Sequence, residues 1–215
     1  MKIKAVIFDL DDTLLQTRKT KYAALKHEAK LFYNFSLTDD DITKHWGKPF
    51  ETFMRDLFQN RYPYEDLRTH YFSIRHLFPN KAYPDALTTV QTLLAHLHVG
   101  ILSSAAKHLV INDLKDLGFD YRQLFYVQGS EDTTVHKPHP GVFAPILLKL
   151  KQRSVAPSET VYIGDTLSDY LAARHAGLEF YGIPERTTPV EVFDQAGAKT
   201  LATISDLLTL LPKYE

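Results

Sequence analysis

Hydrophobic residues follow two different periods along the chain, and the changes between them divide it into segments. The apolar run at 3–8 is β-branched and has the length of a strand, which predicts a buried strand. From about residue 20 to residue 80, hydrophobic positions recur every three or four residues. This spacing predicts consecutive helices, rich in Phe and Tyr and without a strand. After Pro84 helical and extended patterns alternate, as in a parallel sheet whose strands are joined by helices.

The alternating part predicts strands at 98–102, 124–127, 160–163, 179–183 and 199–204. Helices are expected at about 87–97, 109–117, 141–150, 171–176 and 206–211. In the helical part Thr38 begins a capping-box pattern, Gly47 is expected to end a helix, and Pro49 to begin the next. We therefore expect a Rossmann-like, doubly wound, mainly parallel α/β core at 1–15 and 81–215, with a helical bundle at 16–80 inserted as a cap domain.

Composition limits the classes of function. The chain has 215 residues, 44% hydrophobic and 24% charged, with a net charge of −1, so it lacks the basic excess of nucleic-acid-binding proteins. It contains no cysteine, which excludes disulfides, thiolate metal sites and a Cys nucleophile and fits a reducing cytoplasm. No apolar run approaches a transmembrane length, and no signal-peptide pattern begins the chain. We expect a cytoplasmic monomer or weak homodimer without membrane or nucleic-acid partners.

Polar residues with possible chemistry stand where predicted strands end. They are Asp9, Asp11 and Asp12 after 3–8, Ser103 and Ser104 after 98–102, Asp165 with Asp169 after 160–163, and Lys137 before the helix at 141–150. Each also fits a structural role, as an acidic turn, a helix cap or a solvated loop lysine. Because ligands of open α/β sheets bind outside the carboxyl ends of the strands, their joint placement favours a single site.

The chemistry of these groups is typical of phosphoryl transfer. Neighbouring carboxylates repel one another and are costly to desolvate, and a shared cation relieves both effects. Oxygen ligands suit Mg²⁺, while a hydroxyl, backbone amides and an ammonium surround a tetrahedral anion. One Asp could attack phosphorus to form an aspartyl-phosphate. A second, two residues later on the same side of an extended chain, could protonate the leaving oxygen and then activate water.

The order and spacing of these residues resemble a known family. Four short patterns occur in sequence, namely Asp9-x-Asp11-x-Thr13, Ser103, Lys137-Pro138 and Gly164-Asp165-x-x-x-Asp169. They resemble the four motifs of the haloacid-dehalogenase-like hydrolases and cover nearly the whole chain. The helical insert after the first motif resembles the helical C1 cap of subfamily I members such as phosphoglycolate phosphatase and β-phosphoglucomutase. Asp85 departs from the pattern, because relatives commonly have Gly there, near the expected cap hinge.

The resemblance implies the nucleophile and the metal ligands. Asp9 would attack phosphorus and bind Mg²⁺. Asp11 would act as general acid and base and would also bind the metal through its main-chain carbonyl. Asp165 would be the third protein ligand.

The resemblance also implies how phosphate is held. Ser103 and the amide of Ser104 would bind it, with Thr13 supporting the loop. Lys137 would neutralise the nucleophile and the phosphate. Asp169 would hold Lys137 or a metal-bound water.

The expected function is therefore a Mg²⁺-dependent phosphatase acting on a small phosphorylated metabolite. A sugar phosphomutase of the β-phosphoglucomutase type stays open, because it would share these motifs and differ in cap contacts. A haloacid dehalogenase lacks the second carboxylate, so Asp11 argues against it. A phosphonatase needs a desolvated cap lysine, and nothing in the sequence marks one. A non-catalytic binding module should have lost Asp9 or Asp11, and both are present.

Substrate choice is expected to depend on the cap. Lys48 lies in a loop between two predicted helices, where related caps often reach the active site, so it is the first candidate for substrate contact. Arg75 and His45 are further candidates. A solvated loop lysine explains Lys48 equally well.

Overall fold

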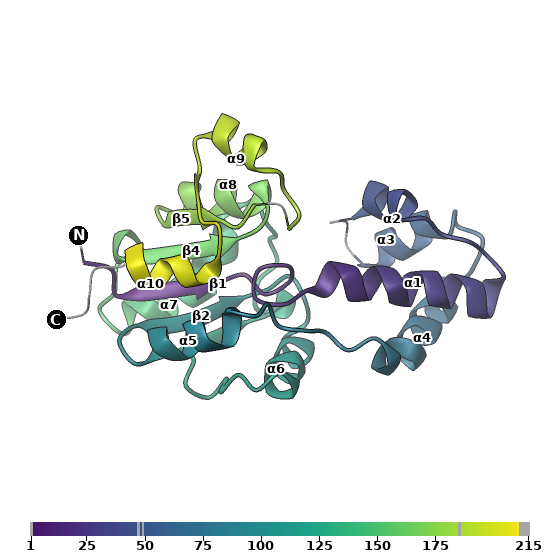
Figure 1. Ribbon diagram of the computed structural model, residues 1–215, viewed down its shortest axis with the longest axis horizontal. Coiled ribbons are helices and arrows are strands. Elements are labelled where there is room, and N and C mark those ends of the chain that lie inside the picture. Colours follow the sequence, from purple (N-terminus) through teal and green to yellow (C-terminus); the bar gives the residue numbers. More distant parts are fainter. Residues whose placement is uncertain (1, 47, 49, 185, 211–215) are drawn as a thin grey trace. The chain divides into compact units, whose positions relative to one another are not determined.

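The computed structural model describes residues 2–46, 48, 50–184 and 186–210. It divides into two compact units, Met1–Gln16 with Lys81–Glu215, and Thr17–Asn80. We call them the α/β unit and the helical unit (Figure 1). Gln16, which the sequence assigned to the helical part, belongs to the α/β unit because its amide donates to the carbonyl of Lys81 over 2.7 Å.

Parallel strands form the sheet of the α/β unit (Figure 1). They are β1 (Ala5–Phe8), β2 (His98–Leu102), β3 (Tyr126–Gln128), β4 (Thr160–Gly164), β5 (Glu179–Gly182) and β6 (Lys199–Thr200). Their order is β3-β2-β1-β4-β5-β6, and every neighbouring pair is parallel. This confirms the doubly wound fold. The order reverses direction between β1 and β4, and a ligand crevice is expected at that switch point.

The register brings the ends of the central strands to one level. Phe8 pairs with Ile101 of β2 on one side and with Ile163 of β4 on the other. The amide of Asp9 then donates to the carbonyl of Ile163 over 2.8 Å, so the pairing with β4 continues one residue further. Asp9 therefore leaves the sheet at the switch point, between the carboxyl ends of β2 and β4.

Helices cover both faces of the sheet (Figure 1). On one face α5 (Ala86–Leu94), α6 (Lys107–Asp116) and α10 (Leu207–Leu210) pack with Val6 and Phe8. On the other, α7 (Ala144–Lys151), α8 (Leu167–His175) and α9 (Val190–Ala196) pack with Ala5 and Ile7. Successive β1 residues thus enter opposite cores, which explains why this strand is apolar at every position.

The helical unit has a hydrophobic core of its own. Its helices are α1 (Thr17–Tyr33), α2 (Asp39–His45), α3 (Phe50–Leu57) and α4 (Tyr64–Ile74), followed by a 3₁₀ turn at Arg75–Leu77. The buried side chains include Tyr22, Leu25, Ile42, Phe58 and Leu67. Thr38 caps α2 in a capping box with Asp41, as the sequence predicts. Gly47 and Pro49, expected to end and begin helices, lie outside the described residues.

Several elements differ from the expected bounds. Helix α9 was not expected, because only Phe193 among its residues is buried and its periodicity is weak. Helix α8 begins four residues earlier than predicted, and α4 ends at Ile74, where a 3₁₀ turn follows. Strand β3 lies two residues later at its start, and β6 is two residues long, followed by a 3₁₀ turn at Ile204–Asp206.

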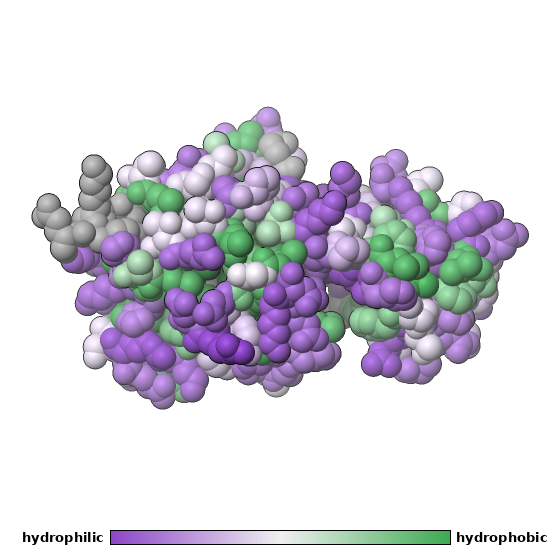
Figure 2. Space-filling model, turned by 60° about the horizontal axis from the view of Figure 1, so that its bottom comes forward, coloured by the Kyte–Doolittle hydropathy of each residue, from purple (hydrophilic) through white to green (hydrophobic). Residues whose placement is uncertain are grey.

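Hydrophilic residues cover most of the face seen in Figure 2, with smaller hydrophobic areas between them. Large hydrophobic side chains exposed in the helical unit include Leu31, Phe32, Phe50, Phe72 and Leu77. Within the described ranges, no helix combines the length and the hydrophobicity that crossing a membrane requires.

Candidate active site

A buried lysine joins two of the expected carboxylates. Lys137 Nζ lies 2.6 Å from Asp9 Oδ1 and 2.7 Å from Asp169 Oδ1. The side chains of Lys137, Asp9 and Asp169 are only 9%, 8% and 2% exposed. The three residues come from distant parts of the chain: the end of β1, the loop before the 3₁₀ turn at Pro140–Phe143, and the first turn of α8. Such charge-assisted contacts, shielded from water, are strong and fix the geometry of both carboxylates.

Negative charge exceeds positive charge around this lysine. Burial raises the pKa of Asp9 well above its usual range; Lys137 opposes this, while Asp169, Asp165 and Asp11 add to it. Burial alone would lower the pKa of Lys137, but the charges of Asp169 and Asp9 outweigh it and hold that pKa above its usual value. Lys137 is therefore a permanent cation near neutral pH, and the carboxylates around it can still accept a further cation.

Asp169 is held by both of its oxygens. Oδ2 accepts hydrogen bonds from the amide of Thr166 over 3.1 Å and from the Thr166 hydroxyl, and so caps α8. Oδ1 accepts a hydrogen bond from the Tyr162 phenol over 2.9 Å and faces Lys137. Gly164 permits this arrangement, since a Cβ there would lie 2.6 Å from Cβ and Cγ of Asp169. Only glycine leaves room for the aspartate.

The loop after β1 is tied to the end of β4. The hydroxyl of Thr13 donates to Asp165 Oδ1 over 3.2 Å, and both residues are buried. Asp12 has a φ of 56°, a left-handed conformation that Asp tolerates, and its amide donates to the carbonyl of Leu15 over 2.7 Å. Burial, followed by the charge of Asp169, raises the pKa of Asp165 to about 7.

The two serines after β2 differ in exposure. Ser103 is buried; its amide donates to the carbonyl of Gln128 over 3.0 Å, and its hydroxyl oxygen accepts from the amide of Ala105 over 3.0 Å. Ser104 is exposed. Ser103 thus hydrogen-bonds to its own turn and to β3. The register still places both serines beside β1, at the same edge of the sheet.

The candidate cations of the helical unit have partners within that unit. Lys48 Nζ lies 2.5 Å from Asp56 Oδ2 and 3.2 Å from His45 Nδ1. The Arg75 guanidinium donates to Asn80 Oδ1 over 2.7 Å and to the carbonyl of Phe78. The side chain of Lys48 is 40% exposed, so this ion pair contributes little to stability and can open to a ligand.

The donor set for a metal consists of oxygen atoms only. Within the described ranges, no group of three or more His, Cys, Asp or Glu side chains is arranged to hold a metal ion. The expected set needs only two side chains, Asp9 and Asp165, because Asp11 would contribute its main-chain carbonyl. Such a set suits a hard cation that keeps water ligands, as Mg²⁺ does. Burial first, and neighbouring aspartates after it, raise the pKa values of Asp9 and Asp165, and a bound cation would oppose both effects.

Two residues beside these groups are not marked by any motif in the sequence. Tyr162 stands two positions before Gly164 on β4, so strand alternation could have placed it on the same side of the sheet. Arg186 follows β5, donates to the carbonyl of Thr13, and lies 3.5 Å from the centroid of the Tyr83 ring. No local pattern marks Arg186, because both partners are distant in sequence.

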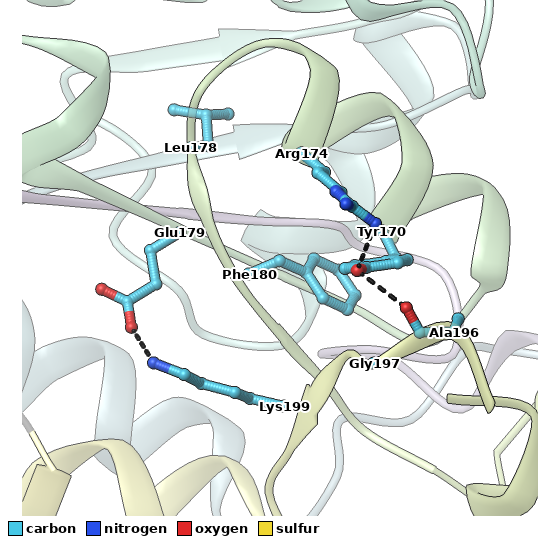
Figure 3. A pocket seen from close by; sticks show the side chains of 8 residues that line it. All are labelled: Tyr170, Arg174, Leu178, Glu179, Phe180, Ala196, Gly197 and Lys199. Atoms are coloured by element: carbon cyan, nitrogen blue, oxygen red, sulfur yellow. Dashed lines mark hydrogen bonds and ion pairs between the residues drawn. The ribbon is translucent and has the colours of Figure 1, made fainter. Parts of the chain in front are cut away.

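A cavity of about 470 Å³ lies elsewhere in the α/β unit (Figure 3). Glu179 and Lys199, which line it, begin β5 and β6, so the cavity is at the amino ends of the strands. Its polar groups contact one another: Lys199 pairs with Glu179 over 2.7 Å, and Arg174 donates to the Tyr170 hydroxyl over 3.2 Å (Figure 3). The expected catalytic groups lie at the opposite, carboxyl ends.

Fold, strand-end carboxylates and buried lysine together define a hydrolase class. The family model of the haloacid dehalogenase-like hydrolases matches residues 6–183, and the chain therefore belongs to this family. A relative from Clostridium perfringens, "putative pyrophosphatase PpaX", is 29% identical over 88% of this chain and 87% of its own. The "pyrophosphatase PpaX" of Anoxybacillus flavithermus is 30% identical over 85% and 84%.

A solved structure from Thermotoga maritima, "putative beta-phosphoglucomutase", has the same fold. Its TM-score is 0.82 at 21% identity, with 99% of this chain and 100% of that chain covered. At this level of identity the likeness concerns the fold alone.

Proposed function

We propose that this hydrolase is a Mg²⁺-dependent phosphatase that hydrolyses a small phosphomonoester through an aspartyl-phosphate on Asp9. The observation that carries the proposal is the contact of buried Lys137 with Asp9 at the switch point of the sheet. A carboxylate fixed beside a permanent cation can meet a phosphate dianion there without prohibitive repulsion. Membership of the hydrolase family and the names of the two pyrophosphatase relatives support phosphatase chemistry.

In the first step an oxygen of Asp9 forms a bond to phosphorus, and the bond from phosphorus to the leaving oxygen breaks. Asp11 donates its proton to that oxygen, so the leaving group departs as a neutral alcohol. Lys137 offsets the charge on the transferred phosphoryl group, and Ser103 with the amide of Ser104 would bind its other oxygens. Asp169 keeps Lys137 in place, because its own position is fixed by Tyr162 and Thr166.

In the second step Asp11, now ionised, takes a proton from water, and the water oxygen attacks phosphorus. The bond from phosphorus to Asp9 breaks, phosphate leaves, and both carboxyl groups return to their starting protonation states. One pair of residues can serve both steps because Asp11 alternates between acid and base. The charge of Asp11 acts on Asp9, which supports their closeness.

Asp9, Asp165 and the main-chain carbonyl of Asp11 would hold Mg²⁺, which supplies charge stabilisation for the transferring phosphoryl group. Thr13 would orient Asp165 through its hydroxyl. The helical unit would act as the cap that excludes water and selects the substrate, with Lys48 as one contact. Lys48 would exchange its Asp56 partner for an anionic group of the substrate.

Pyrophosphate is a second candidate substrate. The two named relatives cover most of this chain at 29% and 30% identity, and both carry the name pyrophosphatase. Pyrophosphate would use the same nucleophile, with phosphate itself as the leaving group. A sugar phosphomutase has weaker support, because the neighbour of that name is 21% identical and shares the fold alone.

Phosphate release tests the proposal. A panel of phosphomonoesters and pyrophosphate should yield phosphate with Mg²⁺ and none after chelation, with activity restored when Mg²⁺ is returned. Asp9→Asn should lower kcat by at least about a thousandfold, because the nucleophile is lost. Asp116→Asn changes an exposed aspartate on α6 and should match the wild type. Equal activity of Asp9→Asn and wild type would contradict the mechanism. Conversion of a sugar 1-phosphate without phosphate release would indicate the mutase.

A further inference from the structure

Arg186 lies where three separate segments of the α/β unit meet. Its guanidinium donates a hydrogen bond to the main-chain carbonyl of Thr13, in the loop after β1. The same guanidinium lies 3.5 Å from the centroid of the Tyr83 ring, in the segment that leads into α5. Arg186 itself belongs to the loop after β5. One half-buried side chain thus bridges two loops that are about seventy residues apart in the sequence.

Thr13 uses every polar group it has. Its amide donates to the carbonyl of Leu10 over 3.3 Å, its hydroxyl donates to Asp165 Oδ1 over 3.2 Å, and its carbonyl accepts from Arg186. The residue is fully buried, so water cannot replace a lost partner. If the carbonyl lost its donor, the peptide could rotate, and the hydroxyl would leave Asp165.

The segment that carries Tyr83 is itself paired with the loop after β1. The amide of Tyr83 donates to the carbonyl of Leu14 over 2.9 Å, and the amide of Gln16 donates to the carbonyl of Lys81 over 2.7 Å. Tyr83 is therefore a fixed platform for the guanidinium. Burial lowers the pKa of Arg186, while the charges of Tyr83, Asp85 and Asp165 oppose this and favour the cation.

We infer that Arg186 is a positioning residue that fixes the loop after β1 and, through the Thr13 hydroxyl, the orientation of Asp165. The inference rests on the proposed function, in which Asp165 binds Mg²⁺. A guanidinium can donate in its plane to a carbonyl while its face rests on an aromatic ring. A lysine ammonium keeps the charge and cannot make both contacts at once. The loop after β1 therefore needs the planar geometry of the guanidinium as well as its charge to stay in position.

Two variants and a matched control test this inference. Arg186→Gln removes the charge and the contact with the Tyr83 ring, whereas Arg186→Lys keeps the charge and cannot make the Thr13 and Tyr83 contacts together. Arg122→Gln removes a different arginine of the same unit, which lies over the Tyr121 ring at 5.7 Å, far from β1 in sequence. Calorimetry with Mg²⁺ alone and no substrate measures metal affinity. Hydrogen exchange of the peptide covering residues 10–16 measures the order of the loop, and denaturation confirms that each variant is folded.

Both Arg186 variants should bind Mg²⁺ about tenfold more weakly than the wild type, because residues that orient metal ligands contribute at that scale. Exchange at 10–16 should be faster in both, and Arg122→Gln should match the wild type in both measurements. Wild-type values for Arg186→Lys would overturn the inference, since charge alone would then suffice. If Arg186→Gln does not fold, Arg186→Lys decides alone. If the wild type neither binds Mg²⁺ nor releases phosphate, the proposed function fails, and exchange at 10–16 decides the inference.

Discussion

Glu28 should make the helical unit less stable as pH rises. Its side chain on α1 is fully buried, and neither carboxylate oxygen has a hydrogen-bond partner in the described part of the chain. Burial raises the pKa of Glu28 to about 8, from 4.5 in the absence of the fold. The folded unit therefore keeps a neutral carboxyl group at neutral pH, whereas the unfolded chain ionises it.

The sign and size of the effect follow from the two pKa values. A raised pKa means that the folded state holds a proton that the unfolded state has released. The contribution of Glu28 to the free energy of unfolding is therefore largest below pH 4.5 and falls until about pH 8. The slope approaches about 1.4 kcal/mol per pH unit, so the total loss is about 5 kcal/mol. Between about pH 6 and pH 9 the free energy of unfolding should fall by about 2–3 kcal/mol from this group. Tyr33, whose pKa is raised to about 12 by burial and then by Glu28, stays protonated throughout.

Trp46 makes the measurement specific to the helical unit. It is the single tryptophan of the chain, and its ring lies 5.1 Å from that of Tyr22 and 5.9 Å from that of Phe53. Urea unfolding followed by its fluorescence at several pH values gives the stability of this unit. In Glu28→Gln the loss of stability toward alkaline pH should shrink by the amount above. Glu65→Gln, which changes a carboxylate that is 75% exposed, should keep the wild-type slope. Identical slopes for Glu28→Gln and wild type would refute the reasoning.

Three further substitutions test the contacts around Lys137. Lys137→Met should lower kcat by at least about a hundredfold, because the ammonium beside Asp9 is lost; steady-state kinetics measures it. Gly164→Ala should lower both kcat and the melting temperature, at a cost of about 1–3 kcal/mol, because its Cβ would collide with Asp169. Tyr162→Phe should reduce the unfolding free energy by about 1 kcal/mol and kcat by about tenfold, because Asp169 loses a donor. Wild-type kinetics in all three would show that the contacts of Lys137 and Asp169 do not matter for turnover.

Much of the fold could be predicted because local sequence patterns determine many of its helices and strands. The buried β1 is apolar at every position, and the capping box at Thr38 is complete within four residues. Elements that bury few side chains were not predicted; in α9, for example, Phe193 is the buried residue. Helix α8 began earlier than predicted because its first turn is set by the capping of Thr166 and Asp169, while the apolar pattern begins later.

The aspartates of the candidate site could be predicted from the sequence, whereas the residues that hold them in position were harder to predict. Asp9 and Asp165 follow predicted strands and Lys137 precedes a predicted helix, so the sequence marked all three, and the resemblance then implied their roles. The contacts of Arg186 with Thr13 and Tyr83 depend on how distant loops meet, and no local spacing encodes that. Lys48 illustrates the reverse case. Its sequence position suggested substrate contact, and the structure shows a pairing with Asp56 that the sequence did not suggest.

The most direct test of the central claim is to trap the phosphoryl group on Asp9. A substrate with a good leaving group, such as 4-nitrophenyl phosphate, needs no proton from Asp11 in the first step, whereas the second step still needs Asp11 as base. In Asp11→Asn, rapid acid quench and mass spectrometry should therefore find a phosphorylated peptide with the phosphoryl group on Asp9. Asp9→Asn should yield none. A phosphoryl group on another residue, or steady turnover by Asp9→Asn, would contradict the account.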